Sequence, residues 1–421
     1  MISLEGIDHK TMKPRVLFIA PLPPPVHGSA MVSQYIKDSQ LVNEAFDCDF
    51  VNLSTSRRMD EIGKGGVKKL LRFVGAYFAL LGKLLTRRYD LCYLAITCHD
   101  MGFLKDAPFV LLCKLFRRKV LIHQHNKGMS GCVERWPYRW LLPLVYRNTT
   151  VMLLSWHLYD DIAKVVSREQ VVICANGIPE QAVGHWPLAV GSRDDDNCAA
   201  ELQANSQKPK ANSQVPSSQP SNKVRWPKGK ATLNSQQISA SRLLFLSNLI
   251  PSKGVYVLLD ACRILRERGL DFVCDFVGGE SKEIDRATFE AEIAKRGLDD
   301  RVAYHGPKYG EEKEAFWQEA DIFVQPTYDD CFPLTLVEAM QHRRAIVSTD
   351  VGAIPDMVED GENGFVCQQK DVDSLAEALA KLITDPALRT AMGERGYARY
   401  QELYTLEAFE KRFVEQLLAI G

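Results

Sequence analysis

The sequence has no long uninterrupted apolar run, no closely paired cysteines and no excess of charge of either sign. Its longest apolar run, at 73–82, ends at Lys83 and is too short to cross a bilayer. The 11 cysteines are scattered without a C-x-x-C pair, which favours reduced thiols in the cytosol over a disulfide framework or a zinc site. The polar start of the chain, at 1–13, predicts no secretory signal.

Charge and length narrow the class of protein further. The 52 basic and 53 acidic residues leave a net charge of −1, which argues against a general nucleic-acid binder. A chain of 421 residues with 46% hydrophobic and 25% charged residues is typical of a soluble globular protein with two domains.

Short apolar runs alternate with longer amphipathic stretches along the whole chain. Such runs predict parallel strands that are covered on both faces, and two successive sets predict two doubly wound, Rossmann-like domains of the α/β class. The runs are 15–20, 48–53, 91–95, 119–123, 151–155 and 171–173 in the first half, and 243–247, 272–277, 302–305, 322–324, 345–348 and 364–366 in the second.

A segment rich in Ser, Asn, Gln, Pro, Lys and Ala, at 187–241, separates the two sets of runs. Trp226 is its only aromatic residue, so the segment buries little, and we interpret it as a linker or surface insertion, with a functional lid as the alternative. We therefore expect an N-terminal domain at 1–186 and a C-terminal domain at 242–403. The helical spacing near the C-terminus predicts a helix at about 404–421 that packs back on the first domain.

Asp330 and Glu338 are separated by seven residues, at a point where a strand pattern gives way to a helical one. We expect the helix at 332–342, with Pro333 as a first helical residue, where its missing N–H costs nothing. Ligands of doubly wound folds collect at the carboxyl ends of the strands, so this loop and helix start are a candidate binding element.

The same helix start can hold two parts of one ligand. The free N–H groups of Leu334 and Thr335 would point out of the helix, where a phosphate oxygen is favoured. Glu338 lies on the same helical face and can accept two hydrogen bonds from a ribose diol. One element could thus bind both the ribose and the diphosphate of a sugar nucleotide. The alternative is that Glu338 is an ordinary solvated acidic residue.

Two loops of the first half also follow predicted strands. Gly28 and Ser29 allow a ligand to approach the backbone at a helix start, and a plain tight turn is the alternative. His123 and His125 project to the same side if the extended conformation persists. A histidine there can donate to a substrate hydroxyl or stabilise developing charge, and a satisfied buried imidazole is the alternative. No third ligand for zinc is evident.

In the second half, Lys253 stands directly before Gly254 and a helix start, where an ammonium can neutralise a diphosphate. An ordinary surface lysine is the alternative. Gly278 and Gly279 follow the next strand and can pass under a base or a sugar. The chain contains no G-x-G-x-x-G motif, which disfavours a nicotinamide cofactor.

Taken together, these motifs resemble the retaining glycosyltransferases of family four, also called group 1 glycosyltransferases. The resemblance rests on the order and spacing of Lys253-Gly254, Gly278-Gly279, the segment from Asp330 to Glu338 and the segment 348–365. The first half is similar through the Gly28 loop, His125-Asn126 and Asn176-Gly177-Ile178.

The resemblance implies a fold of the GT-B type, with the nucleotide-sugar donor held mainly by the C-terminal domain and with neither a metal nor another cofactor required. It assigns Lys253 to the phosphates, Glu338 to the ribose and His125 to the neighbourhood of the transferred sugar. Two positions depart from the family pattern. Asn248 stands where an arginine is usual, and Asp330-Cys331 replaces Glu-Gly.

The implied activity is transfer of a sugar, with retention of configuration, to a hydroxyl of a glycan or lipid-linked glycan, in cell-surface polysaccharide or lipopolysaccharide synthesis. Lys253 and the helix start would stabilise the leaving diphosphate. The expected catalytic residues are His125, Lys253 and Asp330, and the expected donor-binding residues are Gly28, Ser29, Asn248, Lys253, Gly278, Gly279, Leu334, Thr335 and Glu338.

We expect a cytoplasmic protein, with a place at the inner face of the membrane left open. The segment 67–88, basic at both ends and apolar within, fits either a packed helix or a helix that lies on an anionic bilayer. Acceptor contacts are expected from the loops at 99–102 and 127–130. The alternative functions are a sugar-nucleotide epimerase on the same fold and an inactive binding module. The sequence does not indicate which nucleotide or sugar the donor contains.

Overall fold

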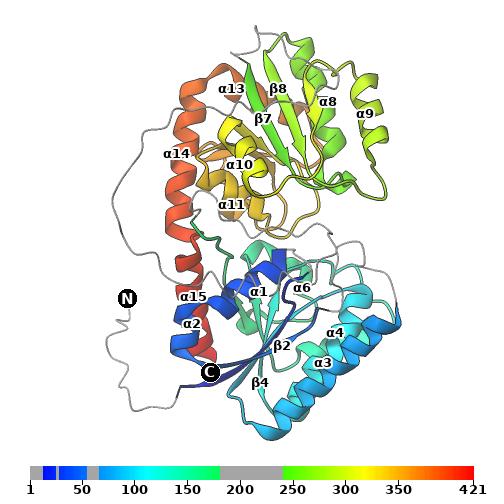
Figure 1. Cartoon of the computed structure of the whole chain (residues 1–421), viewed down its shortest axis with the longest axis vertical. Helices are drawn as coiled ribbons and strands as arrows, with labels where there is room; N and C mark the ends of the chain where they lie inside the picture. The colour runs from blue at the N-terminus through cyan, green and yellow to red at the C-terminus, as the bar shows by residue number, and fades with distance from the viewer. Residues whose placement is uncertain (1–12, 25–27, 55–65, 181–239) are drawn as a thin grey trace.

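The computed structural model describes residues 13–24, 28–54, 66–180 and 240–421. The first twelve residues and nearly all of the predicted insertion at 187–241 lie outside the described residues. The described chain forms an N-terminal and a C-terminal α/β unit that lie one above the other in Figure 1.

Each unit is built on a six-stranded parallel sheet, with strand orders β2-β1-β3-β4-β5-β6 and β12-β11-β10-β7-β8-β9. The strands are β1 (Arg15–Ala20), β2 (Asp47–Asn52), β3 (Leu91–Ile96), β4 (Lys119–Gln124), β5 (Thr150–Leu153), β6 (Val171–Ile173), β7 (Ser241–Leu246), β8 (Phe272–Val277), β9 (Val302–Tyr304), β10 (Ile322–Val324), β11 (Ala345–Thr349) and β12 (Gly364–Cys367). All twelve predicted runs are strands, and the predicted fold class of two doubly wound domains is confirmed.

Helices cover both faces of the N-terminal sheet. The residues of β1 alternate between two apolar clusters, with Phe18 on one face and Leu17 on the other. The Phe18 face is covered by α1 (Gly28–Asp38), α2 (Gln40–Ala45) and α15 (Leu406–Ile420), and the Leu17 face by α3 (Val67–Thr86), α4 (Asp100–Leu115) and α5 (Tyr138–Tyr146). Each strand is therefore buried on both sides, as a parallel sheet requires.

The C-terminal sheet is covered in the same way. One face carries α8 (Val255–Glu267), α9 (Arg286–Lys295) and α13 (Val372–Thr384), and the other α10 (Gly310–Glu319), α11 (Leu334–Gln341), α12 (Ile354–Met357) and α14 (Pro386–Leu403). Among the described residues, no helix is both long and apolar enough to span a bilayer.

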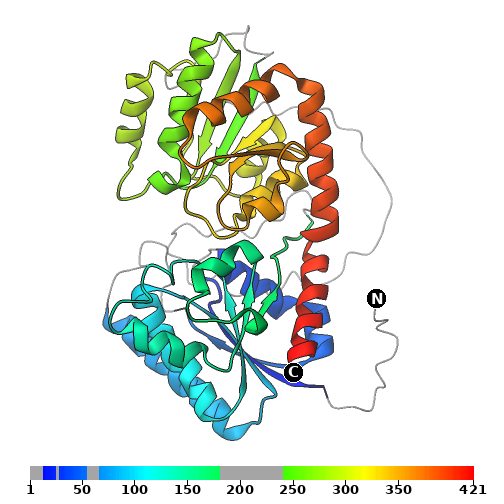
Figure 2. The same ribbon diagram turned by 180° about the vertical axis from the view of Figure 1, so that it is seen from behind.

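The two C-terminal helices link the units. Figure 2 shows α14 beside the C-terminal unit and α15 beside the N-terminal one. Between them, Ile178 N–H donates to Tyr404 O at 3.0 Å. A Cβ on Gly177 would lie 2.3 Å from Thr405 O, so this position admits only glycine. Phe413 of α15 packs against Tyr93 with a centroid distance of 5.4 Å, so the end of the chain is part of the N-terminal core.

Candidate functional site at the domain interface

The carboxyl ends of strands from both sheets meet at the interface of the two units. After β1, a Cβ on Gly28 would lie 4.0 Å from Leu334 Cδ1, so the first residues of α1 and α11 face each other. After β4, Lys127 Nζ lies 3.2 Å from Asp329 Oδ1. Since N-termini of helices attract anions, the two facing helix starts form a candidate anion site.

The helix α11 starts at Leu334, two residues after the start of the predicted helix at 332–342. Pro333 precedes the helix as its N-cap, with ψ 110°, and Leu334 is the first helical residue. The prediction that Pro333 is itself helical is therefore wrong, because its backbone is still extended. The N–H groups of Leu334 and Thr335 nevertheless belong to the first turn, where an N–H has no partner within the helix.

Asp330, Lys253 and Thr335 are joined by short polar contacts. Lys253 Nζ lies 2.7 Å from Asp330 Oδ2 and donates to Asp329 O at 3.1 Å. The buried Gln325 donates to Asp330 Oδ2 at 3.2 Å and accepts from Thr335 Oγ1 at 2.6 Å. The structure thus places three of the predicted site residues in one network, and Gln325 is the link that the sequence analysis missed.

The backbone at Gly254 fixes the position of Lys253. Gly254 has φ 81°, and a Cβ on it would lie 2.0 Å from Pro326 O. Tyr328 N–H donates to Ser252 O at 2.8 Å, so the Lys253 turn is bound to the loop that follows β10. Glycine is needed here both for the left-handed conformation and for the close approach.

Asn248 and the glycine pair form a second part of the site. Asn248 Oδ1 accepts from Gly279 N–H at 3.0 Å. A Cβ on Gly278, which has φ 155°, would lie 1.9 Å from Ser247 O, so the loops after β7 and β8 touch through their backbones. Asn248 is exposed and links these two loops. Its side-chain amide is neutral, so it cannot neutralise a phosphate as an arginine would.

Glu338 is buried, with 3% of its surface exposed, so it is not a solvated surface residue. Its Oε2 lies 2.8 Å from Lys313 Nζ and accepts from Trp317 Nε1 at 3.3 Å. Tyr35 of α1 approaches from the other unit: its buried hydroxyl has no hydrogen-bond partner in the described part of the chain, and burial together with Glu338 raises its pKa. Sequence reasoning missed Lys313, Trp317 and Tyr35, which carry no motif.

The two histidines after β4 project to one side, as their spacing predicts, with ring centroids 3.9 Å apart. His123 is fully buried and its Nδ1 lies 2.7 Å from the Tyr93 hydroxyl, while burial, followed by the neighbouring His125, lowers its pKa well below the usual value. His123 is therefore a core imidazole. His125 is half-buried and stands two residues before Lys127, which reaches Asp329.

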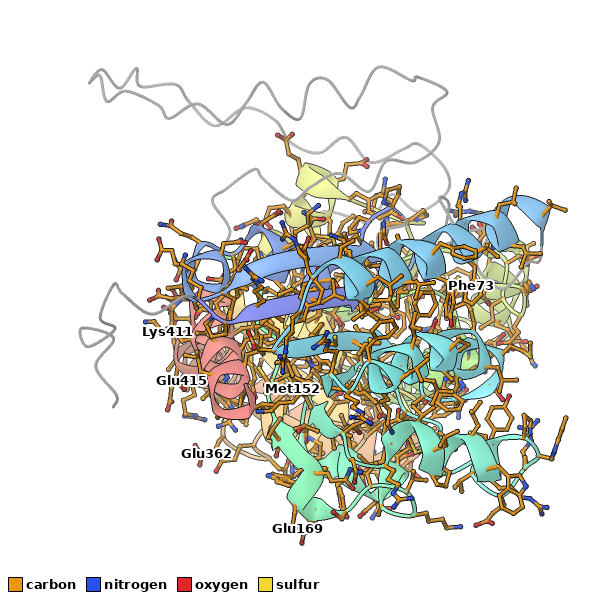
Figure 3. The ribbon with its side chains drawn as sticks, turned by 90° about the horizontal axis from the view of Figure 1, so that it is seen from below. Phe73, Met152, Glu169, Glu362, Lys411 and Glu415 are labelled. Atoms are coloured by element: carbon orange, nitrogen blue, oxygen red, sulfur yellow. The ribbon has the colours of Figure 1, made fainter. Side chains whose placement is uncertain are left out.

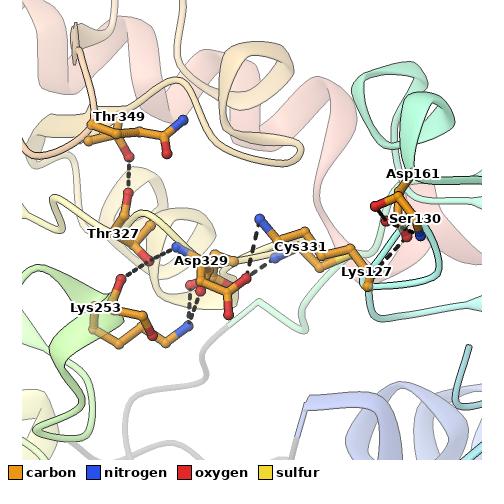
Figure 4. A network of polar contacts seen from close by, with 12 residues as sticks. Lys127, Ser130, Asp161, Lys253, Thr327, Asp329, Cys331 and Thr349 are labelled. Atoms are coloured by element: carbon orange, nitrogen blue, oxygen red, sulfur yellow. Dashed lines mark hydrogen bonds and ion pairs between the residues drawn. The ribbon is translucent and has the colours of Figure 1, made fainter. Parts of the chain in front are cut away.

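A carboxylate holds the loop at 127–130. Asp161 accepts from the N–H groups of Gly128, Met129 and Ser130 at 2.8, 3.0 and 3.1 Å. Figure 4 shows this loop, Lys127 and Asp329 in one network with Lys253. A Cβ on Gly128 would lie 3.1 Å from the ring of His99, so the two loops expected to contact an acceptor touch each other.

Residues 237–399 match the family model of the glycosyl transferases group 1. A D-inositol 3-phosphate glycosyltransferase of Arthrobacter sp. is 32% identical over 155 residues, which are 36% of either chain. The amylovoran biosynthesis glycosyltransferase AmsK of Erwinia amylovora is 32% identical over 147 residues, 34% of this chain and 35% of the relative. The chain thus matches only about a third of the length of these relatives. The match of the family model supports the resemblance seen in the sequence: residues 237–399 are a domain of the group 1 glycosyl transferase family.

Solved structures are similar over nearly the whole chain. Sucrose-phosphate synthase of Thermosynechococcus elongatus has a TM-score of 0.66 at 17% identity and covers 97% of this chain and 100% of its own. HepE of Anabaena, in complex with UDP, has a TM-score of 0.65 at 15% identity and covers 96% and 100%. At this level of identity the similarity shows the fold, which is the two-domain GT-B type.

Proposed function

We propose that this chain is a retaining, metal-independent glycosyltransferase that moves a sugar from a nucleotide-diphosphate donor to a hydroxyl of a glycan or lipid-linked glycan. The group 1 domain at 237–399 and the two facing helix starts support the proposal. The acceptor class follows the similarity to a lipopolysaccharide core mannosyltransferase of Rhizobium leguminosarum, 32% identical over 118 residues (28% of this chain, 33% of the relative), and to AmsK. Synthesis of a cell-surface polysaccharide or lipopolysaccharide in the cytoplasm is the corresponding role.

The observation that carries the proposal is the placement of Lys253 beside the start of α11. Its ammonium has three N–H donors, of which two point to Asp330 Oδ2 and Asp329 O. The third is available for a phosphate oxygen. Together with the N–H groups of Leu334 and Thr335, and with Gly28 and Ser29 opposite, it forms a donor-rich place for a diphosphate.

The remaining donor contacts follow from this placement. Glu338 keeps one carboxylate oxygen on Lys313 and Trp317 and would offer the other to the ribose diol. Gly278 and Gly279 would lie under the base or ribose, with Asn248 beside them. Asp330 would orient the hydroxyls of the donor sugar while it also holds Lys253, and His125 would donate to that sugar from the N-terminal unit.

The reaction breaks the bond between the anomeric carbon and the diphosphate oxygen. Positive charge at Lys253 and the N–H groups of α11 stabilise the negative charge that develops on the leaving diphosphate. The acceptor oxygen then bonds to the anomeric carbon on the face that the diphosphate leaves, which retains the configuration. The acceptor proton passes to the departing phosphate oxygen, so no separate protein base is required. Apposition of the two units excludes water as a competing acceptor.

The test begins with thermal-shift screening of the full chain against UDP, GDP and ADP sugars, followed by a transfer assay with the donor that binds. Glu338→Ala should mainly weaken donor binding, and Lys253→Ala should lower turnover about a hundredfold, the usual cost of losing a charged transition-state contact. Lys295→Ala, at a lysine whose side chain is 73% exposed, is the matched control.

Three other outcomes would contradict the proposal. Parent-rate transfer by both variants removes this site assignment. Nucleotide-sugar interconversion without an acceptor indicates an epimerase, and binding without turnover indicates an inactive module.

A further inference from the structure

An exposed apolar and basic patch covers the turn before α5 and the outer side of α5 itself. Trp136, Trp140 and Leu144 are spaced four residues apart and are 78%, 68% and 54% exposed. Arg139 and Arg147 are exposed beside them, and the guanidinium of Arg139 lies 5.2 Å from the centre of the Trp140 ring. Two large tryptophan side chains exposed side by side form an apolar patch of the kind that usually binds a partner.

A second apolar stripe lies on α3, in the same helical layer. Phe73 points from α3 toward α4 (Figure 3) and meets Phe109 edge-on at 5.4 Å, so the inner side of α3 is packed. Along the outer side, Leu71, Phe78 and Leu85 are 65%, 63% and 68% exposed. The helix is therefore apolar on two sides, of which the core covers only one.

The charge of this region is strongly asymmetric. Between residues 66 and 159, which include the layer of α3, α4 and α5, the sequence has fifteen lysines and arginines and four acidic residues. One of the four, Asp106, is buried, and another, Glu134, pairs with Lys164 at 2.9 Å. Because the whole chain has a net charge of −1, the rest of the molecule is acidic, and the basic charge is concentrated on this part of the N-terminal unit.

We propose that the outer face of α3 and α5 docks on an anionic lipid bilayer. Tryptophan favours the headgroup level of a membrane, where its ring is buried and its N–H remains hydrated. Apolar side chains beside an excess of arginines match a surface that is apolar inside and negative outside, and the exposed acidic residues near the patch, Glu134 and Asp100, are paired with Lys164 and Arg135. The proposed contact is peripheral, with the face lying on the surface of the bilayer.

This inference extends the sequence prediction for 67–88. That prediction left a packed helix and a bilayer-bound helix open, and it did not include the tryptophans of α5. The structure shows that α3 is packed and also exposes an apolar side, so the two alternatives are not exclusive. Docking does not depend on transferase activity, so it can be tested without a nucleotide sugar.

The experiment is co-sedimentation of the full chain with vesicles of phosphatidylcholine alone and of phosphatidylcholine mixed with phosphatidylglycerol. We expect sedimentation with the mixed vesicles, reduced by high salt. Trp136→Ser with Trp140→Ser should abolish it. Arg139→Gln and Arg147→Gln should each weaken partitioning about fivefold, the contribution expected of one basic residue near an anionic surface.

The control replaces exposed apolar residues outside this face, Tyr309→Ser and Leu418→Ser, which are 48% and 43% exposed in the parent. The control should sediment like the parent, and all variants should keep the parent melting temperature, since every replaced side chain is on the surface. Absence of sedimentation with the mixed vesicles, or its persistence in the double tryptophan variant, overturns the proposal. So does a concentration-dependent dimer that the tryptophan variant breaks, which would assign the face to a second copy of the chain.

Discussion

Gly28 faces Leu334 across the domain interface, and a Cβ added at Gly28 would lie 4.0 Å from Leu334 Cδ1. Alanine therefore fits at this position in ordinary van der Waals contact, whereas a longer side chain would enter the space between the two helix starts. We predict that Gly28→Ala keeps donor affinity, and that Gly28→Leu raises the donor Kd at least about tenfold by occupying the place of the diphosphate. Isothermal titration of the donor found by screening provides the measurement, and equal affinities of the two variants would contradict the placement.

Gly254 and Gly361 have nearly the same backbone conformation but different surroundings. Their φ angles are 81° and 79°, yet a Cβ on Gly254 would lie 2.0 Å from Pro326 O, while none of the described atoms lies within 4 Å of a Cβ on Gly361. Gly361→Ala should cost only the left-handed conformation, about 1 kcal/mol of unfolding free energy. Gly254→Ala adds a backbone clash and should cost about 3 kcal/mol or more. Urea unfolding of both variants tests this, and equal losses would refute the close approach that positions Lys253.

Lys253 and Asp330 form a partly buried pair, with side chains 21% and 15% exposed. A double-mutant cycle with Lys253→Met and Asp330→Asn should give a coupling of about 1–2 kcal/mol in unfolding free energy. The exposed pair Arg263 and Glu267, at 44% and 59%, serves as the control and should couple by only about 0.3–0.5 kcal/mol. If the two couplings are equal, the Lys253–Asp330 contact does not persist in solution.

Burial of His123 gives the protein a pH-dependent stability. Burial and His125 lower the pKa of His123 in the folded state, so the folded protein keeps this imidazole neutral while the unfolded chain takes up a proton below about pH 6.5. The unfolded state then binds more protons, so this group contributes stability that is present above the unfolded pKa and is lost as the pH falls, by about 1.4 kcal/mol per pH unit. His123→Gln, which does not titrate, should show a shallower loss between about pH 7 and pH 5. A parent-like slope in denaturant titrations at these pH values would show that His123 is not the source.

The strands were predictable because burial on both faces leaves a local signature. Phe272–Val277 is apolar at nearly every position and is a strand with these same bounds. The turns were equally predictable from their glycines: Gly254 lies at a turn where no side chain fits. By contrast, the helix α11 was predicted to start two residues too early, and Pro333 was placed inside it, because a proline is compatible with both the N-cap and the first helical position.

The partners of the site residues were not predictable. Lys313 and Trp317 hold Glu338 from a separate helix, and Tyr35 approaches it from the other unit. Such contacts depend on side chains that are distant in the sequence and belong to no motif. The exposure of Trp136 and Trp140 escaped notice for a related reason, since spacing alone does not tell an apolar stripe that faces the core from one that faces outward.

The sequence by itself determined two parallel sheets, the loops that follow their strands, and the residue types at those loops, because apolar runs, glycines and helix starts act over a few residues. Only the tertiary structure decided that α1 and α11 begin face to face, that Asp330 shares its carboxylate between Lys253 and Gln325, and that Glu338 is buried. These relationships depend on how two domains and their helices pack, and packing is set by contacts summed over the whole chain rather than by any local pattern.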